Sequence, residues 1–398
     1  MIKGKTVILG ITGSIAAYKA ADIASKLTQA GIMVEVIMTE PATRFISPLT
    51  LSGIVGRPVV TSMWELSSEF SIEHVTLAEA ANVVVIAPAT ASTIAHLAAG
   101  TADDMLTCTV LATKAPVIIA PAMNDNMYNN PITQENIAKL KARGFIFVEP
   151  VYGRLASGKI GQGRLAEIDN ILGIIRSNLG QEGDLAGKRI CVTAGGTKEP
   201  IDPVRFIGNR SSGKMGWALA SAARNRGAEV LLVSAADYLP ETAGIQVVKV
   251  TTAAEMAKAV SNAVKSADAL IMAAAVADYR PKDYAVKKIK KDDTSLTLEL
   301  LKTPDVLMEV KGNLLKVGFA AESENLIANA RKKLMGKKLD IVVANNIADT
   351  DCGFGSDLNR VTIIDKNGRV EALPLMSKRE VADKILDWVV ELIFEGGI

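Results

Sequence analysis

Three short loops of small and polar residues could form a ligand site in the first half of the chain. Gly13-Ser14-Ile15 separates a predicted strand from a helix, so its backbone N–H groups and the Ser14 hydroxyl could hold a phosphate. Loops 88–93 and 121–128 each follow an apolar run. Because the carboxyl ends of parallel strands meet at one edge of a sheet, the loops together predict a mononucleotide site. A tight connection would explain any one of them alone.

Two polar loops and a lysine run could do chemistry in the second half. Ser211-Ser212-Gly213-Lys214 opens a predicted helix and could bind an anion, although it is not the GxxxxGK[ST] of a P-loop. Asp278 closes the segment 273–278 at the end of an apolar strand, and the lysine run 287–291 follows. Such a run is usually a solvated loop, but its place after a strand-end acid favours a clamp for a triphosphate.

Composition restricts the classes of partner. The chain has 398 residues, a formal net charge of +2 and 4% aromatic residues, which argues against a nucleic-acid surface. Cys108, Cys191 and Cys352 are far apart and predict neither a disulfide framework nor a metal site. We expect small-molecule substrates and copies of the same chain as partners.

One uncharged stretch, residues 80–102, is long enough to cross a bilayer. Pro88 and several polar residues interrupt it, so a buried strand, a loop and a small-residue helix are the better interpretation. The first residues run directly into a strand without a signal-peptide pattern. We therefore predict a cytoplasmic protein with no membrane contact.

Short apolar strands alternate with helical patterns through both halves, which is typical of doubly wound parallel sheets. The predicted strands are 6–11, 33–39, 82–87, 116–120 and 145–148, then 188–193, 229–234, 269–275, 296–301, 316–320 and 340–344. The segments 360–365 and 370–375 flank Asn367-Gly368, a strong hairpin signal, and a last helix is expected from Lys378 to about Phe394. The Gly-rich segment 179–187 is the best linker candidate, so the predicted domains are 1–180 and 188–398, joined by 181–187.

The first-half loops resemble those of the flavin-containing cysteine decarboxylases. The matching segments are 13–19 (Gly-Ser-Ile-Ala-Ala-Tyr-Lys), 88–93 (Pro-Ala-Thr-Ala-Ser-Thr) and Pro-Ala-Met-Asn-x-x-Met at 121–127. From Lys5 to the last helix the chain is similar to the bifunctional phosphopantothenoylcysteine decarboxylase/phosphopantothenate–cysteine ligase family. This resemblance implies a flavodoxin-like (Rossmann-like) flavoprotein domain followed by a second Rossmann-like α/β ligase domain.

For the first half the resemblance implies FMN, which would oxidise the thiol of 4′-phosphopantothenoylcysteine so that CO₂ can leave, then return the electrons. His74 matches the catalytic histidine and Asn124 the asparagine that grips the substrate carboxylate. Ser157 occupies the position where the family commonly has a cysteine, and a hydroxyl is a far weaker acid than a thiol. Cofactor contacts are implied for Gly13, Ser14, Thr39, Ala89, Thr90, Ser92 and Met123.

For the second half the resemblance implies a ligase that activates 4′-phosphopantothenate with CTP as an acyl-cytidylate, from which cysteine displaces CMP. Lys288 would stabilise charge during activation, and Asn209 would serve amide formation. Mg²⁺ is expected with the triphosphate, but the sequence does not identify its ligands. Contacts to CTP are implied for Ala273, Ala274, Ala275, Asp278, Lys288, Phe319, Lys333 and Lys337.

Other interpretations are open at this point. A two-domain NAD(P)-dependent oxidoreductase is one, although GxGxxG is missing after both first strands. A flavin-binding regulator without decarboxylase activity is another, which Ser157 keeps open. The family also implies homo-oligomers, with trimeric contacts between decarboxylase domains and dimeric contacts between ligase domains. His96 lies in an apolar helical pattern and is expected to pack.

Overall fold

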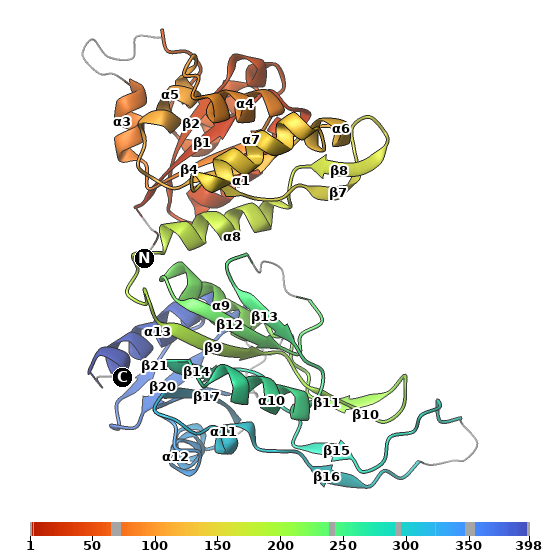
Figure 1. Cartoon of the computed structure of the whole chain (residues 1–398). Coiled ribbons are helices and arrows are strands. Elements are labelled where there is room, and N and C mark those ends of the chain that lie inside the picture. Colours follow the sequence, from red (N-terminus) through yellow and green to blue (C-terminus); the bar gives the residue numbers. More distant parts are fainter. Residues whose placement is uncertain are drawn as a thin grey trace. The chain divides into compact units, whose positions relative to one another are not determined.

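The computed structural model describes residues 2, 4–64, 73–238, 243–290, 296–322, 324–346 and 355–395, with only the backbone for Asn346 and Glu395. Lys291 and Cys352, which figured in the sequence interpretation, lie outside the described residues. The chain divides into two compact units, Met1–Gly180 and Gln181–Ile398, each with its own sheet (Figure 1). The α/β fold class predicted from the sequence is confirmed in both units.

The first unit is built on six parallel strands in the order β3-β2-β1-β4-β5-β6. The chain leaves β1 to one side for β2 and β3, then crosses to the other side for β4, so the carboxyl ends of β1 and β4 form a topological switch point. The strands are nearly continuous apolar runs because both faces are covered. Their bounds are Thr6–Ile11 (β1), Met33–Met38 (β2), Val59–Val60 (β3), Val83–Ala89 (β4), Val117–Pro121 (β5) and Ile146–Phe147 (β6).

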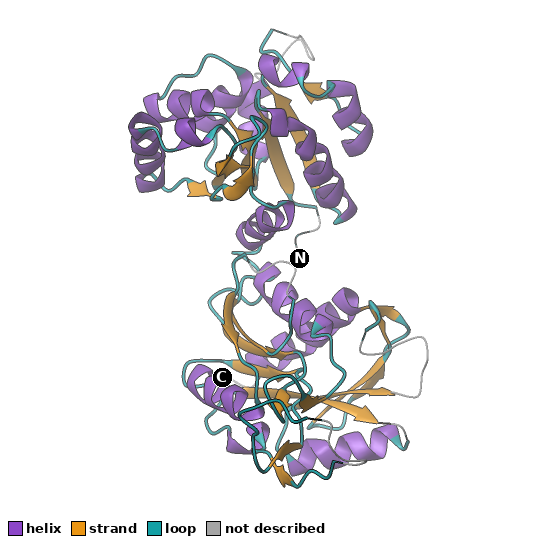
Figure 2. Ribbon diagram, turned by 90° about the vertical axis from the view of Figure 1, so that its right-hand side faces the viewer, coloured by secondary structure: helices purple, strands orange, loops and turns teal. Residues whose placement is uncertain are grey.

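Helices cover both faces of this sheet (Figure 2). One face packs on α1 (Ala20–Gln29), α2 (Pro48–Val55) and α8 (Ile168–Leu179). The 3-10 helix η1 (Ile15–Lys19) directly precedes α1, and η2 (Glu40–Arg44) precedes α2. The other face packs on α4 (Ala91–Ala99), α5 (Met105–Ala112) and α7 (Pro131–Ala142). The short helices α3 (Glu73–Ala80) and α6 (Asp125–Tyr128) lie at opposite sides of the unit in Figure 1.

The second unit repeats the same order in a larger sheet, β13-β12-β9-β14-β17-β18-β20-β21. The first six strands are parallel, whereas β20 and β21 are antiparallel, as the Asn-Gly signal between them predicts. Its switch point lies between β9 and β14. The bounds are Arg189–Ala194 (β9), Glu229–Ser234 (β12), Gln246–Lys249 (β13), Ala269–Met272 (β14), Leu315–Glu322 (β17), Ile341–Asn346 (β18), Val361–Asp365 (β20) and Val370–Ala372 (β21).

The second sheet is also covered on both faces. On one face lie α9 (Lys214–Asn225) and the long last helix α13 (Lys378–Glu395), which pack on each other. On the other face lie α10 (Ala253–Ala263), α11 (Val306–Glu309) and α12 (Leu326–Gly336). The first unit and the second therefore share one plan.

In the described residues, four small antiparallel sheets lie outside the main ones, and the sequence predicted none of them, nor β3 and β13 of the main sheets. The predicted strand 296–301 is corrected here: the strand runs Leu300–Lys302 (β16) and pairs with Tyr279–Pro281 (β15), not with the main sheet. All three β16 residues are exposed, so no buried face fixes the strand in a core. The others are Val151–Arg154 (β7) with Ile160–Arg164 (β8), Lys198–Pro200 (β10) with Phe206–Gly208 (β11), and Leu358–Asn359 (β19) with Met376–Ser377 (β22).

The uncharged stretch 80–102 folds as expected, into the end of α3, the buried strand β4 and helix α4. In the parts of the chain that the structure describes, no helix is long and apolar enough to cross a membrane. The candidate linker is partly anchored. Leu185 is fully buried in the second core, and Asp184 forms an ion pair with the buried Arg226.

Candidate functional site

The first-unit loops predicted to bind a ligand meet at the carboxyl edge of the sheet. The Thr12 hydroxyl, at the end of β1, donates to the Pro88 carbonyl (2.7 Å) and accepts from the Thr90 N–H (3.0 Å), which ties the two sides of the switch point together. Ser14 donates its hydroxyl to the Ala122 carbonyl (3.2 Å) and caps η1. The end of β5 is thereby joined to the same edge.

A cavity of about 690 Å³ opens at this edge. Of the predicted residues, six line it: Gly13, Ser14, Thr90, Met123, Asn124 and Ser157. Residues that the sequence interpretation missed also line it, among them the exposed Ile15 and Tyr18 and the basic Lys19, Arg154 and Arg164. The signal that could have found the basic residues is their place beside the Gly-Ser turn and in the loop 154–164.

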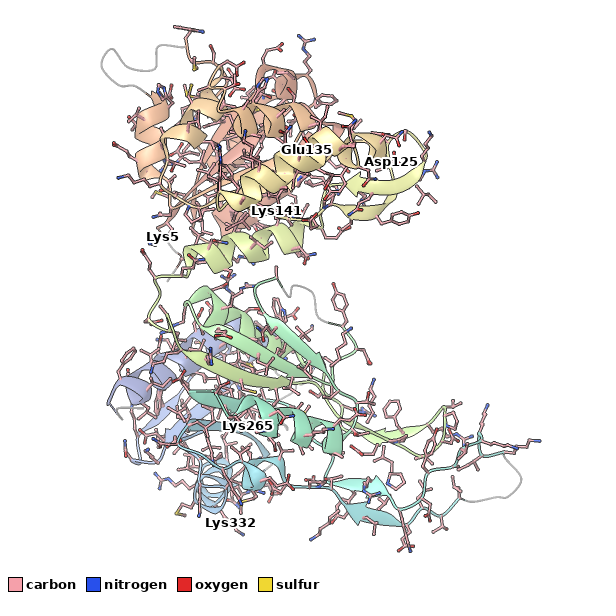
Figure 3. The ribbon with its side chains drawn as sticks, in the orientation of Figure 1. Lys5, Asp125, Glu135, Lys141, Lys265 and Lys332 are labelled. Carbon is pink, nitrogen blue, oxygen red and sulfur yellow. The ribbon has the colours of Figure 1, made fainter. Side chains whose placement is uncertain are left out.

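The hairpin β7–β8 forms one wall of this cavity and carries Ser157 at its tip. Gly163 has φ +146° and its carbonyl accepts from the Met123 N–H (2.9 Å). A Cβ at Gly163 would lie 2.2 Å from the Met123 carbonyl oxygen, so only glycine allows this approach. Figure 3 shows Asp125 beside the hairpin, and a Cβ at Gly161 would lie 2.7 Å from its Cβ. The hairpin is therefore seated directly on the loop that holds Asn124.

The residues near the end of β2 fit a phosphate. A Cβ at Gly13 would lie 2.5 Å from Pro41 Cβ, so the turn must be glycine to lie against the end of β2. Thr39, at that same strand end, has a buried Oγ1 without a hydrogen-bond partner in the described part of the chain. A buried hydroxyl without a partner is costly unless a ligand satisfies it. Phosphate oxygens, as acceptors, would do so.

Several predicted first-unit residues do not line the cavity. Thr39 is half-buried just after β2, Ala89 is fully buried at the end of β4, and Ser92 is exposed on α4. His74 lies in the first turn of α3, which packs on α5, on the side of the unit away from α6 and the hairpin (Figure 1). The structure of one chain therefore does not bring His74 and Asn124 together.

Two further side chains bear on the chemistry. Cys108 is half-buried and lies outside the cavity. Burial, and then the charges of Asp104 and Asp103, raise the pKa of its thiol. A raised pKa makes it unsuited to replace a reactive cysteine. The expectation that His96 packs in an apolar setting is wrong: its side chain is 41% exposed, and its Nδ1 lies 3.5 Å from Asp103.

The second unit has a cavity of about 910 Å³ at the carboxyl edge of its sheet. It gathers all the residues predicted for this unit except Lys288: Asn209, Ala273, Ala274, Ala275, Asp278, Phe319, Lys333 and Lys337. Lysines that the sequence interpretation did not assign line it as well, namely Lys214, Lys302 and Lys378. Lys214 could have been assigned from the Ser-Ser-Gly-Lys turn, whereas Lys302 and Lys378 have no motif around them.

Hydroxyl groups hold the wall of this cavity. Thr193 Oγ1 accepts from the Ala274 N–H (3.0 Å) and Thr197 Oγ1 accepts from the Ala277 N–H (2.9 Å). Asn209 donates its Nδ2 to the Val276 carbonyl (3.1 Å). The segment after β14 is therefore fixed against the segment after β9, across the switch point.

Lys333 is the most buried of the predicted nucleotide contacts with an ionisable group. Its Nζ donates to the Phe319 carbonyl (2.6 Å). Burial lowers the pKa of Lys333, while the nearby Glu322 and Asp278 oppose that shift in part. Lys337 forms an ion pair with Asp305. Two acids, Asp278 and Asp305, therefore line the cavity together with Lys333 and Lys337. Positive groups held in a partly desolvated cavity suit a polyphosphate.

Two family models match the chain. The model described as "Flavoprotein" matches residues 1–180, and the one described as "DNA/pantothenate metabolism flavoprotein C-terminal domain" matches residues 185–393.

Among known proteins, the coenzyme A biosynthesis bifunctional protein CoaBC of Bacillus subtilis (strain 168) is 45% identical over 403 residues, covering 100% of this chain and 99% of the relative. A crystal structure of the C-terminal domain of a CoaBC protein is 41% identical, covers 54% of this chain and 99% of its own, and has a TM-score of 0.46. The FMN-dependent cysteine decarboxylase SpaF is 30% identical, covers 43% and 95%, and has a TM-score of 0.39. The chain belongs to the family of bifunctional coenzyme A biosynthesis proteins, flavoproteins that combine a decarboxylase and a ligase function.

Proposed function

We propose that the first unit, residues 1–180, decarboxylates 4′-phosphopantothenoylcysteine with FMN, and that the second unit makes this compound from 4′-phosphopantothenate, cysteine and CTP, with residues 181–187 as the linker. The observation that carries the proposal is the pair of separate cavities, each at the switch point of its own sheet. The first has small neutral loops, with the unpartnered Thr39 hydroxyl just after β2 near them in the fold, and the second is rich in lysine. One suits a flavin phosphate and the other a nucleoside triphosphate.

In the first unit, Gly13, Ser14 and Thr39 would hold the FMN phosphate, and Ala89, Thr90, Ser92 and Met123 would contact the ring. When bound, FMN supplies the oxidation of the substrate thiol that allows CO₂ to leave, and the return of the electrons. Asn124 accepts the Asn126 N–H through its Oδ1 (3.0 Å), which leaves its Nδ2 to donate to the substrate carboxylate. Ser157, on the hairpin tip, would donate a hydrogen bond to the reacting sulfur.

The catalytic base is assigned to His74, which must then come from a neighbouring copy of the chain. Within one chain His74 lies on the far side of the unit from Asn124, and apolar side chains beside the cavity (Ile15, Tyr18, Met127) are exposed. Both features support flavin sites at trimer contacts. In the second unit the small sheets expose Phe206 and Tyr279, and the segment after β15 exposes Val286, which supports dimer contacts there.

In the second unit, the carboxylate of 4′-phosphopantothenate would attack the α-phosphorus of CTP, forming an acyl-cytidylate and releasing pyrophosphate. The amine of cysteine would then attack the acyl carbon and displace CMP. Lys333 and Lys337 neutralise phosphate charge, Lys288 stabilises the charge of the activation step, and Asn209 orients the groups of the second step. Ala273, Ala274, Ala275, Asp278 and Phe319 would contact the nucleotide.

A divalent ion, Mg²⁺, would accompany the triphosphate. In the described part of the chain no group of three His, Cys, Asp or Glu side chains could form a cage. Asp278 and Asp305 line the cavity, and hard carboxylate oxygens together with phosphate oxygens are the ligands that Mg²⁺ prefers. The site fits an ion held mainly by the nucleotide. We place the enzyme in the cytoplasm, with small molecules as its substrates.

The test is a coupled assay on the purified full chain. We expect a yellow protein that releases pyrophosphate and CMP from CTP when 4′-phosphopantothenate and cysteine are both present, and then releases CO₂. Absence of bound flavin after gentle purification would contradict the first-unit assignment. Ligation with no CO₂ release would leave a flavin-binding regulator fused to a ligase, and hydride transfer to added NAD(P) would indicate the oxidoreductase instead.

A further inference from the structure

The turn between β10 and β11 contains a carboxylate, Asp202, that no solvent reaches. Its side chain is 0% exposed. Oδ1 accepts from the backbone N–H groups of Val204 and Arg205, both at 2.8 Å, which is the ordinary way in which an aspartate closes a turn. Oδ2 instead accepts from the backbone N–H of Ile289 at 3.2 Å. The second oxygen is thus used for a segment 87 residues away in sequence.

Ile289 belongs to a strap, here defined as residues 282–290, which leaves β15 and carries Lys288. Two more contacts tie the strap to the same turn. The Ala285 N–H donates to the Ile201 carbonyl (3.0 Å), and Arg205 Nη2 donates to the Ile289 carbonyl (3.3 Å). Ile289 therefore has both its N–H and its carbonyl bound to the turn. Lys288, directly before it, is exposed.

The turn alone does not explain a carboxylate at this position. An asparagine closes the same kind of turn with its single carbonyl oxygen and avoids the cost of burying a charge. Burial acts to raise the pKa of Asp202, but the hydrogen bonds from Val204, Arg205 and Ile289 and the charge of Arg205 outweigh it, so the pKa lies below its usual value. The group is thus ionised and both oxygens accept. What the second oxygen adds is the strap.

The same hairpin leads to the other residue assigned to ligation. β11 ends at Gly208, and Asn209 follows, with its Nδ2 bound to the Val276 carbonyl in the wall of the cavity. A turn fixed at Asp202 therefore sets the place of the strap relative to the element that carries Asn209.

We infer that Asp202 is a positioning residue of the ligase, which holds the backbone beside Lys288 so that this lysine is in place for the activation step. The inference rests on the proposed function, because it assumes the role given there to Lys288. Asp202 itself touches neither nucleotide nor substrate. Its effect should therefore appear in the step that uses Lys288 and in no other.

Asp202→Asn is the sharpest test, because the amide keeps Oδ1 for the turn and replaces Oδ2 with an N–H₂ group that cannot accept from Ile289. Loss of one hydrogen bond to a charged group predicts a fall of about 10- to 100-fold in the single-turnover rate constant for pyrophosphate release from CTP and 4′-phosphopantothenate without cysteine. We expect the KM for CTP, bound flavin and CO₂ release to be unchanged. Asp237→Asn is the matched control, an acid-to-amide change at an 84% exposed residue that pairs with Lys198 of β10.

A double-mutant cycle separates positioning from a general loss of structure. In a Lys288→Met background, Asp202→Asn should cause no further fall in pyrophosphate release, because the residue that it positions is gone. An equal fall in both backgrounds, or wild-type kinetics of Asp202→Asn, would overturn the inference. If wild-type protein releases no pyrophosphate, the proposed function fails instead. Should Asp202→Asn not fold, Arg205→Met removes only the contacts of a 42% exposed side chain and should lower the same step.

Discussion

The two cavities lie at equivalent places of equivalent sheets, yet they differ in the number and source of the charged side chains that line them. In both sheets the first strand is flanked by the second and fourth in sequence, and the cavity opens where the chain switches sides. The first cavity has small neutral loops, and its basic residues are Lys19 of η1 and Arg154 and Arg164 of the hairpin. The second has lysines from α9, α12, α13 and β16 around it.

This difference shows how one sheet plan serves two chemistries. In any sheet with this strand order, the switch point presents backbone N–H groups and the N-termini of helices, which can bind a phosphate. The loops and added elements then determine what lines the cavity. In the first unit this is a hairpin that approaches the Asn124 loop closely through its glycines, and in the second it is lysines from four separate elements. The ligand class therefore depends on what surrounds the edge, not on the sheet.

The largest effect is expected from His74→Asn. Removal of a general base predicts a fall of about 10²- to 10⁴-fold in decarboxylation, while ligation, which belongs to the other unit, stays as in wild type. Rates of CO₂ and pyrophosphate release on the same sample measure both. His96→Asn is the matched control, since that histidine is outside the cavity and pairs with Asp103. Equal decarboxylation by both variants would remove His74 from the mechanism.

An intermediate effect is expected from Gly163→Ala. The new Cβ would lie 2.2 Å from the Met123 carbonyl oxygen, so the hairpin must shift off the Asn124 loop. A displacement of this size predicts a fall of about 10²-fold in kcat/KM for decarboxylation, with ligation unchanged. Gly153→Ala in the facing strand β7, where the nearest atom would be Arg164 Nη1 at 3.7 Å, should have little effect. Full activity of Gly163→Ala would show that the seating of the hairpin is not needed.

The smallest effect is expected from Lys333→Met. We expect CTP affinity to fall about tenfold, because one hydrogen bond to a charged group is lost. Titration calorimetry measures the affinity. Lys332→Met is the control, because Lys332 lies exposed on the same helix and points outward in Figure 3. The two variants should differ in affinity; if both bind CTP as wild type does, Lys333 does not contact the nucleotide.

The depressed pKa of Lys333 adds a pH dependence. Between that pKa and the ordinary lysine value the unfolded chain binds more protons than the folded one, so stability of the second unit rises with pH. CTP affinity should fall in the same window, since the positive charge is lost. Lys333→Met should abolish this loss of affinity, and a wild-type affinity that is flat up to the ordinary lysine range would contradict the assignment.

Much of the fold follows from the sequence because strands buried on both faces read as short apolar runs. β1, β12 and the β20–β21 hairpin lie where the pattern predicts them. The strands of the small sheets have no such apolar pattern. The buried residues of β8 are Gly161 and Gly163, that of β10 is Glu199, and β7, β11 and β16 have no buried residue. The cavity residues in loops after buried strands were predictable, as Gly13, Asn124 and Asp278 show.

Only the tertiary structure decided which distant residues meet. Lys302 and Lys378 line the second cavity from segments with no motif, and Asp202 binds Ile289 across 87 residues. It also separated His74 from Asn124 within one chain. The sequence by itself determined most of the buried strands, the loops at their ends and the family, because local patterns and burial on both faces encode them. Contacts between segments far apart in the chain depend on the packing of whole elements, which no local pattern records.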